Sequence, residues 1–140
     1  MDSNGRHQRT HVVAVTTVMA AIGAIHAFRF GSYLNGAWYT YYYSYASDLM
    51  LPFGAYFLLS VSENQFRFLE SWYVKALIVF AVMTFSEIMQ LFGVYLFGVT
   101  FDIIDILMYG IGALSAAFSD KQILGRLVPS WKGRKESFII

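Results

Sequence analysis

The sequence predicts an all-α polytopic membrane protein with four transmembrane helices. Of its 140 residues, 57% are apolar and only 14% are charged, whereas about a quarter of the residues in soluble proteins are charged. The apolar residues gather in four segments, each close to the roughly 20 residues with which a helix crosses a bilayer core. Residues 76–83 show no period of two, so a β-barrel is not expected.

The first two segments are residues 12–28 and 46–61. The first is interrupted only by small residues, two threonines and His26, and the second carries Asp48 near its start. Between them, residues 38–45 are rich in Trp and Tyr, whose amphipathic rings favour the headgroup layer of a membrane. We therefore expect this aromatic run to form an outer loop.

The third and fourth segments are residues 72–97 and 101–118. The third is long enough to tilt in the bilayer and contains Glu87 and Gln90. The fourth begins with two aspartates and continues with small residues on the same helical face. These four segments predict a bundle of four helices.

Basic residues predict the orientation of the bundle. Nine of the ten Lys and Arg residues fall on one side of the membrane if there are four spans, and only Arg29 falls on the other. Because cytoplasmic loops carry the excess of positive charge, we expect both termini to be cytoplasmic. We expect one transmembrane domain over residues 1–120 and a basic, partly amphipathic cytoplasmic tail over residues 121–140, lying along the inner leaflet. The nine residues are Arg6, Arg9, Arg67, Lys75, Lys121, Arg126, Lys132, Arg134 and Lys135.

Composition also limits the function. The chain has no Cys, which excludes disulfides, thiol nucleophiles and Cys-ligated metal centres. Its net charge of +1 creates no field that would recruit nucleic acid, so membrane lipid is the expected partner. A homodimer through small-residue faces, either Gly112 with Ala116 or Gly23 with Ala27, is open.

Polar residues inside the predicted spans are the candidate site. An ionisable side chain in hydrocarbon costs roughly 2.5–3.5 kcal/mol, so such groups face protein or water and usually mark a site or an ion path. By their place along the spans, all of them are expected to converge on the outer half of the bundle, with nothing comparable in the inner half. The candidate residues are His26, Arg29, Asp48, Glu87, Gln90, Asp102 and Asp105.

Structural roles compete with functional ones at some of these positions. Asp102 lies at the expected start of a helix, where an aspartate caps the free N–H groups and favours the positive end of the helix dipole. Arg29 is read either as a counter-ion to an aspartate or as a substitute cation for the site. His26 is read as a hydrogen-bonded packing residue, with a ligand role as the alternative. Glu87 and Asp105 are the acids for which a functional role is preferred.

The third and fourth segments resemble the VanZ-like family. Its members pair E-x-x-Q on one membrane helix with R-x-x-S/D-x-x-D-x-x-x-N-x-x-G-A at the start of the next. The resemblance covers residues 83–118, with Val99 in place of the Arg and Tyr109 in place of the Asn. The positions that match are Glu87, Gln90, Asp105, Gly112 and Ala113.

This resemblance implies a multi-pass protein of the bacterial cytoplasmic membrane, linked to the cell envelope and to low-level teicoplanin resistance. We expect an outward acidic pocket that binds an amphiphilic or lipid-linked ligand through Asp48, Glu87, Gln90, Asp102 and Asp105. Binding of a phosphate would require a divalent cation or Arg29, because carboxylates repel phosphate.

Two other functions are weighed. The first is a small proton- or cation-coupled transporter that uses Glu87 as the protonatable acid. The second is an enzyme, which is disfavoured because no nucleophile triad, phosphate loop or metal motif is present. No catalytic residue and no organic cofactor are assigned, and a bound metal is left open.

Overall fold

The computed structural model of the chain describes residues 3–96 and 100–132 and is helical throughout, with no strand in those ranges. Short helical turns join the long helices, and the all-α fold predicted from the sequence is confirmed. The four long helices are α1 (Ser3–Ala27), α2 (Ala37–Val61), α3 (Trp72–Leu91) and α4 (Ile103–Phe118). The shorter segments are η1 (Phe30–Tyr33), η2 (Ser62–Asn64), η3 (Arg67–Glu70), the π-helical η4 (Ser119–Leu124), α5 (Gly125–Leu127) and η5 (Pro129–Lys132).

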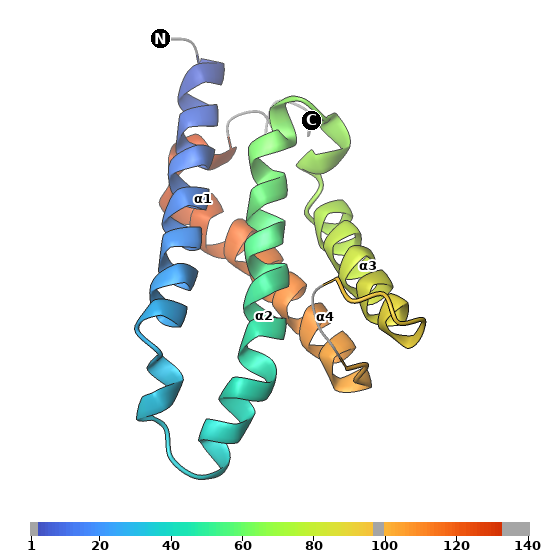
Figure 1. The fold of residues 1–140 in the computed structure, drawn as a ribbon. Coiled ribbons are helices and arrows are strands. Elements are labelled where there is room, and N and C mark those ends of the chain that lie inside the picture. The colour runs from blue at the N-terminus through green and yellow to red at the C-terminus, as the bar shows by residue number, and fades with distance from the viewer. Residues whose placement is uncertain (1–2, 97–99, 133–140) are drawn as a thin grey trace.

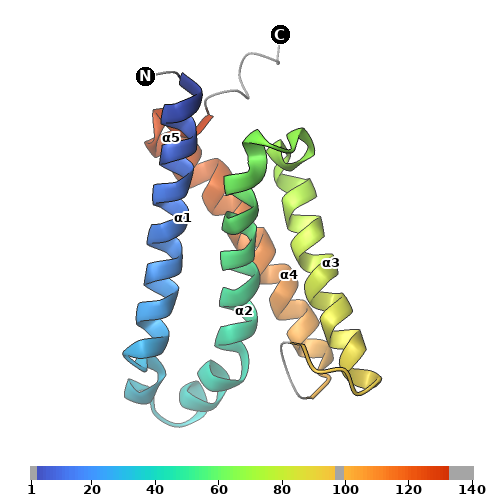
Figure 2. The same ribbon diagram turned by 45° about the horizontal axis from the view of Figure 1, so that its top comes forward.

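The long helices alternate in direction, and α4 crosses behind α2 from the far end of α3 to the N-terminal half of α1 (Figures 1 and 2). The first turns of α1 and the last described segment, η5, pack together at one end of the bundle, here called the termini end. At the opposite end the hairpin of α1 and α2 extends beyond α3 and α4 (Figure 1).

Three stretches are long and apolar enough to cross a membrane: Gln8–Ala27, Trp72–Leu91 and Ile103–Leu127. The helix α2 has 25 residues, which is also sufficient length, but its first turns are dominated by Tyr and Ser. Length and composition therefore support a helical membrane protein with three candidate spans in the described part of the chain.

Two helix ends differ from the sequence prediction. The helix α2 begins at Ala37, so the aromatic run predicted as an outer loop forms its first turns. The helix α3 ends at Leu91, well before residue 97, because Gly93 adopts a left-handed conformation with φ of 77°. The Val94 N–H then donates to the Met89 carbonyl at 3.0 Å and the Gly93 N–H to the Gln90 carbonyl at 3.1 Å, the pattern of a Schellman cap.

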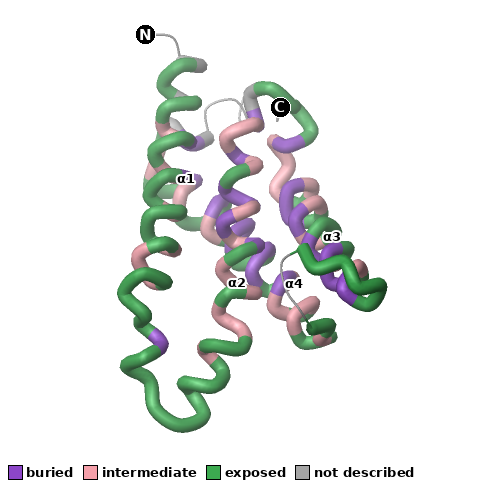
Figure 3. The backbone as a smooth tube through the Cα atoms, viewed as in Figure 1, coloured by how far each residue is buried: buried purple, intermediate pink, exposed green. Residues whose placement is uncertain are grey.

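The core lies where α2, α3 and α4 meet, and α1 is exposed over most of its surface (Figure 3). The helices α2 and α4 lie close together at Gly112, where an added Cβ would lie 2.6 Å from Pro52 Cγ and even closer to the Leu49 carbonyl oxygen. The face of Gly112 and Ala116, one of the two faces considered for a dimer, is thus buried inside one chain. At Gly23 an added Cβ would meet nothing within 4 Å, so a dimer through the face of Gly23 and Ala27 stays a prediction.

The C-terminal segment is part of the fold as far as η5. The helix α4 continues through η4 and α5 without a break, so the predicted boundary after residue 120 falls inside a helix. Trp131 is buried, and its ring stacks on His11 with centroids 4.0 Å apart, which contradicts a tail lying free along the membrane surface. The predicted basic residues Arg134 and Lys135 lie outside the described residues.

Candidate functional site: an acid cluster and a lysine cluster

Polar side chains form two clusters along the interface of α3 with α4. The acid cluster comprises Asp48, Glu87, Asp102 and Asp105 and lies away from the termini. The lysine cluster is centred on Lys75 at the termini end. The α-helical rise of 1.5 Å per residue separates Glu87 from Lys75 by about 18 Å along α3.

Glu87 is the innermost member of the acid cluster and is 1% exposed. Its Oε1 accepts a hydrogen bond from the Asp102 backbone N–H at 3.0 Å. Its Oε2 accepts from Gln90 Nε2 at 3.1 Å and from the Tyr109 hydroxyl at 2.9 Å. The carboxylate therefore joins the end of α3 to the start of α4, with donors on both oxygens.

Asp102 has the structural role that its position suggests. Its side chain caps α4 by accepting a hydrogen bond from the Ile104 N–H at 2.9 Å. Since its own backbone N–H donates to Glu87, Asp102 links the cap of α4 to the buried glutamate.

Asp48 and Asp105 form the outer part of the acid cluster. They come from α2 and α4, are only partly buried, and lie close enough for their charges to interact. Both carboxyl groups also lie within electrostatic range of Glu87 and Asp102. Neighbouring carboxyl groups repel each other when both are ionised, so this pair can hold a proton or offer acceptors to a donor.

Three buried polar atoms have no hydrogen-bond partner among the described residues: Thr84 Oγ1, Ser86 Oγ and Gln90 Oε1. Gln90 is 7% exposed and is fixed beside Glu87 by its Nε2. Because a buried acceptor without a donor costs free energy, Gln90 Oε1 marks a place where a ligand donor would be favourable.

His26 and Arg29 lie apart from the acid cluster. His26 Nδ1 donates to the Ile22 carbonyl at 3.0 Å, and its Nε2 lies 3.5 Å from Ser47 Oγ, as expected for a packing histidine. Arg29 is exposed with φ of 49°, and within the described ranges it forms no ion pair with an acid. Both line a separate cavity of about 190 Å³ with residues of α2. The predicted convergence of all the polar groups therefore does not include His26 or Arg29.

The lysine cluster contradicts the expectation that the inner half holds nothing comparable. Lys75 is fully buried, forms an ion pair with Glu63, and donates to Asp120 Oδ2 at 3.0 Å and Ser60 Oγ at 3.1 Å. Asp120 also accepts from the Tyr56 hydroxyl and from Trp131 Nε1, both at 2.6 Å. Lys75 thus pairs with acids inside the protein. It is not an exposed loop charge, so it does not contribute to the predicted orientation.

Helical spacing could have identified the lysine cluster. Asp120 follows Ala116 by four residues and continues the stripe of Asp105 and Gly112 on α4. Lys75 begins a row of buried residues spaced by four that continues through Val79 and Met83 to Glu87. Extending both stripes to the ends of the helices would have placed an acid against a lysine.

No protein family, curated protein or solved structure matches the chain. Among the described residues, no group of three or more His, Cys, Asp or Glu side chains is arranged to hold a metal ion. The acid cluster itself offers carboxylate acceptors and, beside them, the buried amide oxygen of Gln90, which has no donor among the described residues.

Proposed function

We propose that the chain is a VanZ-like, multi-pass protein of the bacterial cytoplasmic membrane, with α2 as a fourth span and the termini end in the cytoplasm. The support for this orientation is that Arg6, Arg9, Arg67 and Arg126 are all exposed at the termini end. The support for the family is the match of Glu87 and its neighbours over residues 83–118. In this orientation the acid cluster lies toward the outer face.

The proposed ligand is an amphiphile whose head donates hydrogen bonds, such as an ammonium or a polyhydroxyl group. The acid cluster offers acceptors, and Gln90 Oε1 is a further buried acceptor without a donor in the described chain. A phosphate head fits less well, because Arg29 lies elsewhere and the described acids form no metal-binding group. The observation that carries the proposal is that Asp48 and Asp105, from two helices, lie within electrostatic range of each other and of buried Glu87.

Calorimetry on the purified protein in lipid nanodiscs tests this proposal, with octylammonium and octyl phosphate as probes. We expect saturable binding of octylammonium and none of octyl phosphate. Replacing Asp48→Asn together with Asp105→Asn should weaken octylammonium binding at least tenfold, since hydrogen bonds to charged groups contribute about 1.5–3 kcal/mol each. Glu70→Gln, at the termini end, is the matched control and should leave binding unchanged.

Equal affinity for the two probes, or full affinity in the double variant, contradicts the proposed ligand class. Teicoplanin susceptibility of cells that express the same variants tests the link to envelope function. The double variant should lose any resistance that the unmodified chain and the Glu70→Gln variant confer.

A proton-coupled transporter is the second candidate, favoured by the position of the Asp48 and Asp105 carboxyl groups within electrostatic range of each other. The coupling acid would be this pair and not Glu87, because Glu87 already accepts three hydrogen bonds. Substrate-driven proton movement in dye-loaded liposomes would distinguish this function from simple binding. Flux that is lost with Asp105→Asn supports transport, and binding without flux supports the first proposal.

A further inference from the structure

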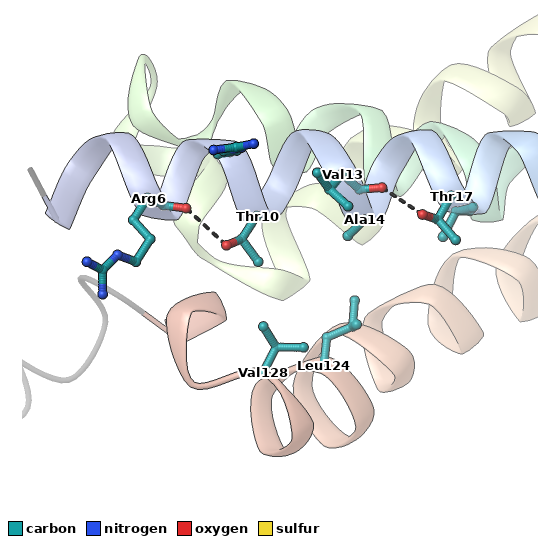
Figure 4. A pocket seen from close by; sticks show the side chains of 9 residues that line it. Arg6, Thr10, Val13, Ala14, Thr17, Leu124 and Val128 are labelled. Atoms are coloured by element: carbon teal, nitrogen blue, oxygen red, sulfur yellow. Dashed lines mark hydrogen bonds between the residues drawn. The ribbon is translucent and has the colours of Figure 1, made fainter. Parts of the chain in front are cut away.

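A groove separates α1 from the segment that follows α4, at the termini end (Figure 4). Its volume is about 680 Å³, within the range of small-molecule and cofactor sites. One wall is α1 with Val13 and Ala14, and the facing wall carries Leu124 and Val128, which point toward α1 (Figure 4). This groove lies far from the acid cluster, and what is inferred from it rests on the proposed membrane orientation but not on the proposed ligand of the acids.

The floor of the groove is apolar although it includes two threonines. The Thr10 hydroxyl donates to the Arg6 carbonyl at 3.0 Å, and the Thr17 hydroxyl donates to the Val13 carbonyl at 2.9 Å (Figure 4). Because both hydroxyl protons are used by the helix backbone, the threonines add little polarity to the groove. An acyl chain is the kind of group that such a surface accepts.

The charge of the groove lies at one end only. Arg6 and Arg9 line its mouth, are exposed, and form no ion pair within residues 3–96 and 100–132. From Arg9 to Val18 the helix rises about 14 Å, close to half the roughly 30 Å thickness of a bilayer core. The positive mouth and the apolar floor therefore match the head and the chain of one leaflet's lipid.

We propose that this groove binds one anionic phospholipid, with its phosphate between Arg6 and Arg9 and an acyl chain against Val13 and Leu124. Basic pockets between helices on the cytoplasmic side favour anionic headgroups. Only 11% of the most apolar stretch of α1 is buried inside the fold, so most of this helix face is accessible to lipid in a bilayer. A second copy fits less well, because a two-fold axis along the membrane normal would bring the arginines of both copies to the same depth.

Native mass spectrometry of the full chain, released from detergent with equal amounts of dioleoyl phosphatidylglycerol and dioleoyl phosphatidylcholine, tests this site. We expect one retained phosphatidylglycerol that excess inorganic phosphate does not displace. Arg6→Gln with Arg9→Gln should weaken its retention about 30-fold, since each arginine near an anionic headgroup contributes a factor of about five. The matched control, Arg67→Gln with Lys121→Gln, removes the same charge at the same end outside the groove and should have little effect.

A second pair of variants separates the groove from the charges. Val13→Trp should fill the groove and abolish retention, whereas Leu77→Trp, at an exposed position of α3, should not. The proposal is overturned if the groove variant (Arg6→Gln with Arg9→Gln) and its charge control lose lipid equally. The same holds if Val13→Trp retains the lipid, or if inorganic phosphate displaces it. It is also overturned if the chain is a dimer that Val13→Trp converts to a monomer without loss of lipid.

Discussion

Lys75 holds two acids of different segments in place with one ammonium group. Its Nζ contacts Glu63, which follows α2, and Asp120, which lies in the π-helical turn after α4. All three side chains are at most 4% exposed. Removing one member of a buried ion pair leaves an uncompensated charge, which costs about 3–5 kcal/mol.

Replacing Lys75→Met should therefore lower the free energy of unfolding by about 3–5 kcal/mol, because two carboxylates lose their counter-ion. Denaturant titration of the purified protein in detergent micelles measures this change. Lys121→Met is the control, since Lys121 is exposed and lies 5.4 Å from the centroid of the Trp72 ring. Its loss should cost about 0.5–1 kcal/mol, and an equal loss in both variants would show that the lysine cluster adds no stability.

Tyr109 connects α4 to the buried acid. Its hydroxyl donates to Glu87 Oε2 at 2.9 Å, and its side chain is 4% exposed. In the sequence this position is notable because Tyr stands where the VanZ-like pattern has an Asn, and the hydrogen bond to Glu87 was not predicted.

The packing of α2 on α4 depends on Gly112. Without a Cβ at this position, the backbone of α4 lies against Leu49 and the ring of Pro52. Pro52 also lacks the N–H that would bond to the carbonyl of Asp48, which leaves that carbonyl free of the usual helical bond. At this point α4 thus contacts α2 through a glycine that faces the turn containing the proline.

Gly112→Ala should destabilise the protein by about 1–3 kcal/mol, because its Cβ would overlap backbone that cannot move aside. Gly23→Ala, a matched change in α1 with nothing within 4 Å, should be neutral or raise the free energy of unfolding by up to about 1 kcal/mol. Thermal unfolding of both variants in the same detergent tests the difference. If Gly112→Ala is as stable as Gly23→Ala, the helices do not approach as described.

The sequence predicts the helices better than their ends. Apolar segments identify four helices because each must bury its backbone polar groups in its own hydrogen bonds. The end of α3 depends on the left-handed Gly93, a local signal that hydropathy does not contain. The start of α2 was missed because Tyr and Trp favour a membrane interface equally well in a loop and in the first turns of a helix.

Long-range contacts are the part that no local pattern contains. His11 Nε2 lies 3.4 Å from the Trp131 carbonyl oxygen, and the two residues are 120 positions apart. Apolar and basic residues around Trp131 fit a surface helix as well as a docked segment, so the sequence alone could not decide between them. The docking follows from the partners that Trp131 finds in Asp120 and His11.

The orientation of the bundle in the membrane can be tested because the chain has no Cys. Ser32→Cys and Gln65→Cys each place one thiol at an exposed position, the first before the N-terminal end of α2 and the second beyond its C-terminal end. With the termini end in the cytoplasm, a membrane-impermeant maleimide should label Ser32→Cys in intact spheroplasts and Gln65→Cys only after lysis. The reverse pattern would contradict the orientation predicted from the basic residues.

The two clusters give the fold polar contacts at both ends of the α3–α4 interface and an apolar middle around Val79, Met83 and Ala113. The lysine cluster brings the Lys75 ammonium into contact with the carboxylates of Glu63 and Asp120, so removing the lysine would leave buried charge without a counter-ion. The acid cluster has acceptors of one sign and a buried amide oxygen without a donor in the described chain. This asymmetry is the physical reason to assign stability to the first and ligand binding to the second.

Cross-linking tests most directly whether the two acids of α2 and α4 face each other. The variant for this test carries Asp48→Cys and Asp105→Cys in an otherwise cysteine-free chain. A short bis-methanethiosulfonate reagent should join the two thiols within one chain. Intact mass spectrometry would then show one bridging reagent per chain instead of two separate adducts. Asp48→Cys with Leu107→Cys, which lies on an exposed face of α4, should give two separate adducts. Bridging that is no more efficient in the Asp48 and Asp105 pair than in this control would contradict the acid cluster.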